Sequence, residues 1–214
     1  MYLAIEGVIG VGKTSLARLL QPVFQAELLL EVFEENPFLS DFYADRKRYA
    51  FQTQIFFLLS RYHQQHEGVP LALSRGNLIS DYTFDKDSLF ARLNLEGDEL
   101  EMYDRVHLAL AERIMRPDLI LYLRADTDIA LNRIALRDRS YERNMDRAYI
   151  DDLNRAYDEF FSGPQSAPIL AVDTNQMDFV GMPAHLNAIA GRIRAALGII
   201  PFQPQLPLQG GTPA

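Results

Sequence analysis

The residues best suited to chemistry stand at the start of the chain, in the segment GVIGVGKT, residues 7–14. This segment satisfies the pattern G-x-x-x-x-G-K-[ST], with an apolar stretch before it and a helical pattern after it. Its glycines allow backbone N–H groups to surround phosphate oxygens, and the N-terminus of the following helix adds positive potential. We expect Lys13 to act on the terminal phosphates of a nucleotide and Thr14 to bind Mg²⁺. The full set expected to contact the nucleotide is Gly7, Val8, Ile9, Gly10, Val11, Gly12, Lys13, Thr14 and Ser15.

A phosphate-binding loop does not by itself identify an enzyme, and a glycine-rich turn that merely packs a strand on a helix is the alternative. A regulatory GTPase would also carry an N-K-x-D segment, which the sequence lacks. Its D-x-x-G match, residues 178–181, lies too near the C-terminus to be a switch loop. A nucleic-acid motor would usually be larger and more basic. These comparisons favour a small-molecule kinase, which needs little more than a lid and an acceptor pocket.

A second group of chemically useful residues is the charged run RIALRDRSYERN, residues 133–144. It contains Arg133, Arg137, Arg139 and Arg143. The first two are four residues apart, so they share one helix face. A solvated basic stripe is the ordinary interpretation of such a run. Guanidinium groups also stabilise the charge of a phosphoryl group during transfer, and in an acidic protein such a cluster favours this second interpretation.

The composition limits the classes of protein that remain. At 214 residues the chain is long enough for one α/β domain. Its formal net charge of −8 argues against nucleic-acid binding, which needs a basic surface. The absence of cysteine excludes disulfides and thiolate metal sites, and no apolar run reaches the ~18 residues of a membrane span. With no signal peptide at the N-terminus, we expect a cytoplasmic protein without a membrane or nucleic-acid partner.

Apolar and amphipathic segments alternate along the chain. Short apolar runs predict strands at residues 2–5, 27–32, 77–82, 119–123 and 169–172. Helical periodicity predicts helices at residues 15–24, 37–43, 49–66, 99–115, 128–136 and 184–197, with one more ending near 161. This alternation predicts an α/β fold of the P-loop NTPase type, a three-layer sandwich with a five-stranded parallel sheet between helices. Residues 1–199 would form this domain, and the Pro-, Gly- and Gln-rich residues 200–214 a flexible tail.

Four further segments accompany the phosphate-binding loop in a fixed order: EVFEENPF, DFYADRKRYAFQTQIFFLLSR, ISDYTFDKDSLFA and the run RIALRDRSYERN. Together with the loop they resemble the deoxynucleoside kinase family, and in order and spacing its bacterial deoxyguanosine and deoxyadenosine kinases. The resemblance covers residues 2–197. It implies that the chain uses ATP and Mg²⁺ to phosphorylate the 5′-hydroxyl of a purine deoxynucleoside in nucleotide salvage. Deoxyguanosine is the favoured substrate, and a deoxyadenosine or broad-specificity kinase is the alternative.

The resemblance places Glu31 where the family has the glutamate of an E-P-V segment, at the C-terminal end of the second strand. Phosphoryl transfer needs a carboxylate that orients the attacking hydroxyl or accepts its proton, and Glu31 is the expected catalytic residue for this step. Val32 replaces the usual proline. Glu34 and Glu35 are alternative candidates for this role. We interpret both as solvated residues that cap the next helix.

The family's contacts to the acceptor fall on two consecutive helices. Tyr43 matches a tyrosine that hydrogen-bonds the sugar 3′-hydroxyl, and Gln54 matches a glutamine whose amide makes paired bonds to the base. Arg61 lies seven residues beyond Gln54 on the same helix face, and Phe90 matches a phenylalanine that stacks on the base. Without the resemblance, ordinary helix surface would be the better interpretation of Tyr43 and Gln54. Three other phenylalanines at helical spacing are interpreted as core: Phe51, Phe56 and Phe57.

Asp81 closes the third predicted strand, and a carboxylate there commonly holds Mg²⁺ next to the substrate. In much of the family this strand ends in D-R-S or E-R-S, whereas here tyrosine and threonine follow the aspartate, so the arginine is missing. Lys86 is the expected catalytic replacement near the 5′-oxygen, and the departure favours the deoxyguanosine branch. The alignment permits a shift of one residue here, which leaves Asp85 and Asp87 as alternative functional carboxylates.

The charged run matches the family lid, expected at about residues 137–147. The resemblance implies that Arg133, Arg137 and Arg139 surround the phosphates, the last two as catalytic residues. Glu142 stands where the family has a glutamate that bonds the 3′-hydroxyl, and Tyr141 replaces the first lid glutamate.

After the fifth strand, Asp178 and Phe179 lie where the family holds the adenine of ATP. The family also pairs through two long helices, so the resemblance implies a homodimer formed by residues 49–66 and 99–115. Two other functions remain open. A thymidylate-type nucleoside-monophosphate kinase shares the fold but needs a basic pocket for the acceptor phosphate. A non-catalytic nucleotide sensor would need the glycine-rich loop but not Glu31 or Arg137.

Overall fold

The computed structural model describes residues 1–32, 35–143, 145–165 and 167–199. At its centre is a parallel sheet of the strands β1 (Tyr2–Gly7), β2 (Ala26–Leu29), β3 (Asn77–Ser80), β4 (Leu119–Arg124) and β5 (Ile169–Asp173). Their spatial order is β2-β3-β1-β4-β5. The chain therefore leaves β1 toward one edge of the sheet and leaves β4 toward the other. In open parallel sheets a crevice forms at such a switch point, beyond the carboxyl ends of the strands.

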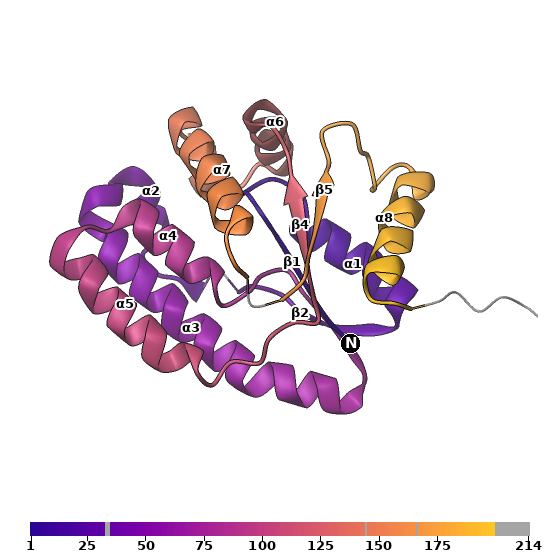
Figure 1. Ribbon diagram of the computed structural model, residues 1–214. Helices are drawn as coiled ribbons and strands as arrows, with labels where there is room; N and C mark the ends of the chain where they lie inside the picture. Colours follow the sequence, from indigo (N-terminus) through magenta and orange to yellow (C-terminus); the bar gives the residue numbers. More distant parts are fainter. Residues whose placement is uncertain (33–34, 144, 166, 200–214) are drawn as a thin grey trace, which may run out of the picture.

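Helices cover both faces of the sheet, as Figure 1 shows, with α1 and α8 on one side and α3, α4, α5 and α7 on the other. The bounds of the helices are α1 (Lys13–Phe24), α2 (Leu39–Ala44), α3 (Arg46–Arg75), α4 (Lys86–Asn94), α5 (Gly97–Ala111), α6 (Thr127–Arg137), α7 (Arg147–Ser162) and α8 (Pro183–Ala196). A short 3₁₀ helix, η2 (Ser140–Glu142), follows α6. The predicted α/β sandwich with a five-stranded parallel sheet is confirmed.

The first strand is buried on both faces, and its alternate residues pack into two different clusters. Leu3 and Ile5 belong to the main core with the buried residues of α1, whereas Tyr2 and Ala4 pack with Val69 near the end of α3. All six residues of β1 are buried, which explains why this strand is an unbroken apolar run apart from Glu6. This double packing anchors the segment that enters the glycine-rich loop.

The second strand is shorter than the sequence predicts, because it ends at Leu29 and not at residue 32. The backbone N–H of Asp81 donates to the carbonyl of Leu29, 3.4 Å away. Beyond this point the backbone hydrogen bonds between the two strands stop, and the N–H of Glu31 donates instead to the side-chain carboxylate of Asp81 at 2.8 Å. Glu31 therefore lies just past the strand, in the crevice.

The third helix runs to Arg75, beyond the predicted end at residue 66, although Gly68 and Pro70 lie in this part. Gly68 and Pro70 have unfavourable helix propensity, but burial of Val69 and Ala72 against the sheet outweighs it. The helix α4 was not predicted, and α5 ends at Ala111 and not at 115.

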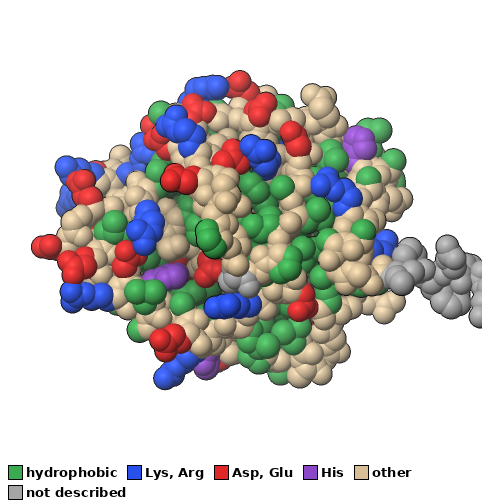
Figure 2. Space-filling view, viewed as in Figure 1, with side chains coloured by type: hydrophobic (Ala, Val, Ile, Leu, Met, Phe, Trp, Pro, Cys, Tyr) green, Lys and Arg blue, Asp and Glu red, His purple; other side chains and the backbone are tan. Residues whose placement is uncertain are grey.

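Within the described residues, none of the helices is both long and apolar enough to cross a membrane. On the face shown in Figure 2, acidic and basic side chains are interspersed.

Candidate functional site

A cavity of about 690 Å³ lies at the crevice and collects most of the predicted site residues. Residues 9–15 of the glycine-rich loop form one part of its wall. The other predicted residues that line it are Glu31, Tyr43, Gln54, Arg61, Asp81, Lys86, Phe90, Arg133, Arg137, Arg139, Glu142, Asp178 and Phe179. Gly7 and Val8 do not line it: Gly7 ends β1, and the side chain of Val8 is buried in the core.

The glycine-rich loop has the backbone geometry that its sequence predicts. Gly10 and Gly12 have φ angles of 85° and 105°, in the left-handed region that favours glycine. A Cβ atom at Gly10 would lie 2.6 Å from the carbonyl oxygen of Ala130, so α6 also requires glycine there. The loop ends where α1 begins, at Lys13. Backbone N–H groups and the N-terminus of α1 therefore face the cavity together, as an anion site requires.

The side chain of Lys13 folds back onto the loop, where Nζ donates to the carbonyls of Gly7 at 2.7 Å and Val8 at 3.1 Å. Burial lowers the pKa of Lys13 to about 8, with a further contribution from the charge of Lys86. The nearby carboxylates, led by Glu6, act in the opposite direction. An anionic ligand in the loop would favour the charged lysine in the same way.

Thr14 and Asp81 meet at the floor of the cavity, where the Thr14 hydroxyl donates to the Asp81 carboxylate. A hydroxyl and a carboxylate beside a phosphate-binding loop are oxygen donors, which Mg²⁺ prefers. The residues therefore fit the predicted magnesium site. No group of three or more His, Asp or Glu side chains in the described chain is arranged to hold a metal. A magnesium ion here would therefore take its remaining ligands from nucleotide phosphates and water.

Glu31 lies between two cations in the cavity. Lys86 Nζ donates to Oε2 of Glu31 at 2.7 Å, and Arg61 Nε donates to Oε1 at 2.9 Å. All three side chains are largely buried, with exposed fractions of 14% for Glu31 and 5% for each cation. Burial alone would raise the pKa of Glu31, but the charges of Arg61 and Lys86 outweigh it and hold the pKa well below its ordinary value. The carboxylate is therefore ionised and held in one orientation.

Asp87, one of the alternative carboxylates, lies behind this group. It is fully buried and forms an ion pair with the guanidinium of Arg61. Arg61 thus joins two carboxylates from different segments, and only Glu31 lines the cavity. Lys86 starts α4, and its Nζ lies 5.5 Å from the ring centroid of Phe90 on the next turn.

Tyr43 and Gln54 lie on the wall formed by α2 and α3. The Gln54 side chain is buried, and within the described residues its Oε1 atom has no hydrogen-bond partner. Burying such an atom without a partner is costly, so an acceptor of this kind facing a cavity is suited to a ligand donor. Burial raises the pKa of Tyr43 well above its ordinary value, so its hydroxyl stays protonated and able to donate.

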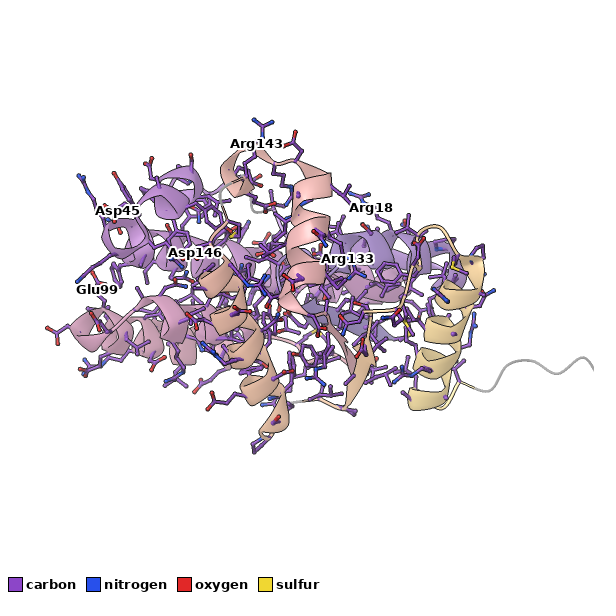
Figure 3. The ribbon with its side chains drawn as sticks, turned by 90° about the horizontal axis from the view of Figure 1, so that it is seen from above. Arg18, Asp45, Glu99, Arg133, Arg143 and Asp146 are labelled. Carbon is purple, nitrogen blue, oxygen red and sulfur yellow. The ribbon has the colours of Figure 1, made fainter. Side chains whose placement is uncertain are left out.

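The charged run forms the end of α6 and the η2 segment. Arg137 Nε donates to Glu142 Oε2 at 3.2 Å, and Arg139 lies 3.7 Å from the same carboxylate. Glu142 is buried, whereas Arg143 pairs with Asp138 at the exposed outer edge of this segment (Figure 3). Two of the predicted lid arginines therefore face the cavity together with Glu142, and Arg143 does not.

Arg133, which is expected from the sequence to contact phosphates, also binds the protein backbone. Its guanidinium donates to the carbonyl of Val11 at 3.1 Å and to that of Thr174 at 2.9 Å. It thus ties the glycine-rich loop to the segment after β5, near the middle of the view in Figure 3. In that segment the Asp178 carboxylate accepts hydrogen bonds from the N–H groups of Val180 and Gly181, and Phe179 packs on Gly12.

Several cavity residues were not predicted: Arg18, Leu39, Phe42, Thr53, Leu136, Tyr149, Met177 and Val180. Phe57, predicted as core, also lines the cavity, with the guanidinium of Arg61 4.6 Å from its ring centroid. Helical spacing could have placed Phe57 there, because Gln54, Phe57 and Arg61 are separated by three and four residues. Phe51 is partly buried against the core, as predicted, and Phe56 is partly exposed. Glu34 lies outside the described residues, and the side chain of Glu35 is exposed.

A glycine-rich loop after the central strand, a largely buried carboxylate and an arginine-bearing segment line one cavity, and together they define a P-loop phosphotransferase. A family model described as deoxynucleoside kinase matches residues 3–197. The chain therefore belongs to the deoxynucleoside kinase family, and it is an ATP-dependent kinase that acts on a deoxynucleoside.

Individual relatives agree with this assignment. A deoxyguanosine kinase of Bacillus subtilis is 33% identical over 198 residues, which cover 90% of this chain and 96% of the relative. A deoxyadenosine kinase of Dictyostelium discoideum is 38% identical over 164 residues, 74% of this chain and 66% of the relative. Among solved structures, a deoxyadenosine kinase from M. mycoides with bound dATP superimposes with a TM-score of 0.80. It is 28% identical, and the match covers 91% of this chain and all of that one.

Proposed function

We propose that the protein transfers the γ-phosphoryl group of ATP to the 5′-hydroxyl of a purine deoxynucleoside, with deoxyguanosine as the preferred acceptor. The observation that carries this proposal is the position of Glu31, which lines the same cavity as the phosphate-binding loop and Gln54, whose amide oxygen has no hydrogen-bond partner among the described residues. A nucleoside between Gln54 and Glu31 would point its sugar alcohol toward the loop. The deoxyguanosine kinase of B. subtilis, aligned over almost its whole length, supports the choice of base.

Glu31 orients the 5′-hydroxyl and receives its proton as the bond from the 5′-oxygen to the γ-phosphorus forms. The bond from the γ-phosphorus to the bridging oxygen breaks in the same step, and ADP leaves. Arg61 and Lys86 hold the carboxylate in place, and Lys86 also lies where it can neutralise charge near the attacking oxygen. Lys86 thereby supplies the cation that the segment after Asp81 lacks.

Recognition of the nucleoside uses groups of complementary hydrogen-bonding character. The amide of Gln54 offers an acceptor and a donor to one edge of a base, and Phe90 offers a face for stacking. Tyr43 donates to the 3′-hydroxyl, and Glu142 accepts from it. Glu142 also pairs with Arg137, so the carboxylate that accepts from the sugar holds a lid arginine at the same cavity.

ATP is bound through residues 9–15, and its adenine lies against the segment of Asp178 and Phe179. Residues 137–147 act as the lid, in which Arg137 and Arg139 contact the transferred phosphoryl group while Arg133 steadies the loop and the adenine segment. Thr14 and Asp81 hold Mg²⁺, whose positive charge offsets that of the phosphate oxygens. Residues 1–199 form this single domain.

We further propose a homodimer formed by α3 and α5, which lie side by side in Figure 1. Large apolar side chains are exposed on these helices, among them Leu59 at 50%, Met102 at 54% and Leu108 at 68%. Covering these side chains with the same helices of a second copy removes them from water. Light scattering should then give twice the chain mass of 24.4 kDa. A monomer at micromolar concentration would rule the dimer out.

The test of the function is a panel of the four deoxynucleosides with MgATP, monitored by ADP release and by separation of the products. The expected result is turnover with deoxyguanosine as the acceptor of highest kcat/KM. A higher kcat/KM with deoxyadenosine would correct the base preference alone. Consumption of dGMP or dTMP in place of any nucleoside would overturn the proposal in favour of a monophosphate kinase.

A further inference from the structure

One buried carboxylate lies outside the chemistry described so far. Glu6, the penultimate residue of β1, is fully buried and does not line the cavity. Its Oε1 accepts hydrogen bonds from the backbone N–H of Thr83 at 2.6 Å and from the Thr83 hydroxyl at 2.9 Å. Its Oε2 accepts from the Tyr157 hydroxyl at 3.2 Å and from the N–H of Gly7 at 3.4 Å. Four donors from three parts of the fold thus converge on this one side chain.

The donors hold the Glu6 side chain in one orientation, because both of its oxygens accept hydrogen bonds from backbone N–H groups and from hydroxyls. The pKa of Glu6 is raised, mainly by burial, while the charges of Lys86 and Lys13 and the Thr83 hydrogen bonds act in the opposite direction. A buried group satisfied in this way fixes the position of the groups that it contacts.

The first connection from Glu6 runs through Thr83 to Lys86. The Thr83 hydroxyl, which Glu6 orients, accepts a hydrogen bond from the backbone N–H of Lys86 at 3.3 Å. This contact lies at the start of α4, whose first residue is Lys86. From there the Lys86 ammonium reaches Glu31 at 2.7 Å. Glu6 therefore determines where α4 begins, and through it where the Lys86 ammonium lies.

The second connection holds Glu6 itself in place. Its Oε2 accepts from the N–H of Gly7, where β1 ends, and from the hydroxyl of Tyr157 on α7. The carboxylate that orients Thr83 is therefore fixed against two other elements of the fold.

We infer that Glu6 is a positioning residue: it fixes the start of α4 through Thr83, so that the Lys86 ammonium meets Glu31. This inference rests on the proposed roles of Lys86 and Glu31. Glu6 itself touches no substrate.

The part played by Glu6 itself is tested with Glu6→Gln, by measuring kcat and the KM for MgATP in a variant shown to be folded. A loss of about tenfold in kcat is expected, with the KM for MgATP within about threefold of the wild type, because the contacts to Thr83 that place Lys86 are weakened. An unchanged kcat in the folded variant would refute the positioning role.

The positioning role is tested with Thr83→Val, which removes the hydroxyl, against Thr83→Ser, which keeps it. The valine variant is expected to lose between about tenfold and about a hundredfold in kcat, since small displacements of reacting groups are costly. The serine variant should recover most of this loss. This pair keeps the inference open to refutation should Glu6→Gln fail to fold: equal kcat values for the two variants would overturn it. Wild-type protein without kinase activity would instead refute the proposed function.

Discussion

Replacing Glu31 with glutamine exchanges one oxygen for an NH₂ group and removes the negative charge that Arg61 and Lys86 share. The new amide retains one acceptor, so it can satisfy only one of the two cations. The loss of the carboxylate as orienting group and proton acceptor is expected to lower kcat by about 10²–10⁴. This corresponds to roughly 3–5 kcal/mol in the activation free energy.

The same change also affects stability, because both cations are 5% exposed and lose their counter-charge. Removing one partner of a buried ion pair costs about 3–5 kcal/mol. Asp87 still pairs with Arg61, so we expect a value near the lower limit, about 3 kcal/mol. For a chain of this size that amounts to a decrease in Tm of about 6–12 °C.

The assay couples ADP release to NADH oxidation at 25 °C with saturating deoxynucleoside, after circular dichroism has shown that the variant is folded. Glu35→Gln is the matched control, since it makes the same chemical change at an exposed neighbour. A Glu31→Gln variant that keeps kcat within about threefold of the wild type would refute the assignment. A large loss in Glu35→Gln with Glu31→Gln unaffected would transfer the role to the rival glutamate.

Four further outcomes are expected. Lys86→Ala should reduce kcat by about tenfold or more in the ADP assay, because it removes a cation 2.7 Å from Glu31. Gln54→Leu should raise the KM for the nucleoside by about tenfold while Tm is unchanged or higher, because the free protein loses a buried oxygen without a partner in the described residues. Tyr82→Phe should lower Tm by about 2–4 °C in thermal denaturation, because its hydroxyl donates to Gln64 at 2.7 Å and such a bond contributes about 1 kcal/mol. The difference in Tm between wild type and Glu31→Gln should shrink as the pH falls below about 4. Folding lowers the pKa of Glu31, so its carboxylate contributes stability above the pKa of the unfolded chain and loses that contribution on acidification.

The phosphate-binding loop could be predicted from the sequence because its geometry is local. Eight consecutive residues hold the glycines with positive φ and the lysine that begins α1, so spacing alone specifies the backbone. The strands β1 and β4 are equally local, since each is an apolar run long enough to be buried on both faces. The arginine run after β4 is also visible as a departure from an acidic background.

The surroundings of Glu31 could not be predicted from spacing. Its carboxylate pairs with Arg61 of α3 and Lys86 of α4, and its backbone N–H donates to the Asp81 carboxylate just past β3. These partners are 30, 55 and 50 residues distant in sequence. Which of the neighbouring carboxylates faces the cavity depends on where β2 leaves the sheet. The resemblance to a known family selected Glu31, and the fold explains the choice physically.

The sequence by itself determined the loop, the strands and the class of chemistry, because backbone geometry and hydrophobic burial are set by neighbours along the chain. Only the tertiary structure decided that Arg133 binds the loop backbone, that Asp87 pairs behind Arg61, and that Glu6 accepts hydrogen bonds from Thr83. These are polar contacts between residues far apart in the sequence. Their strength depends on distances of a few ångströms and on exclusion of water, and neither is encoded in residue spacing.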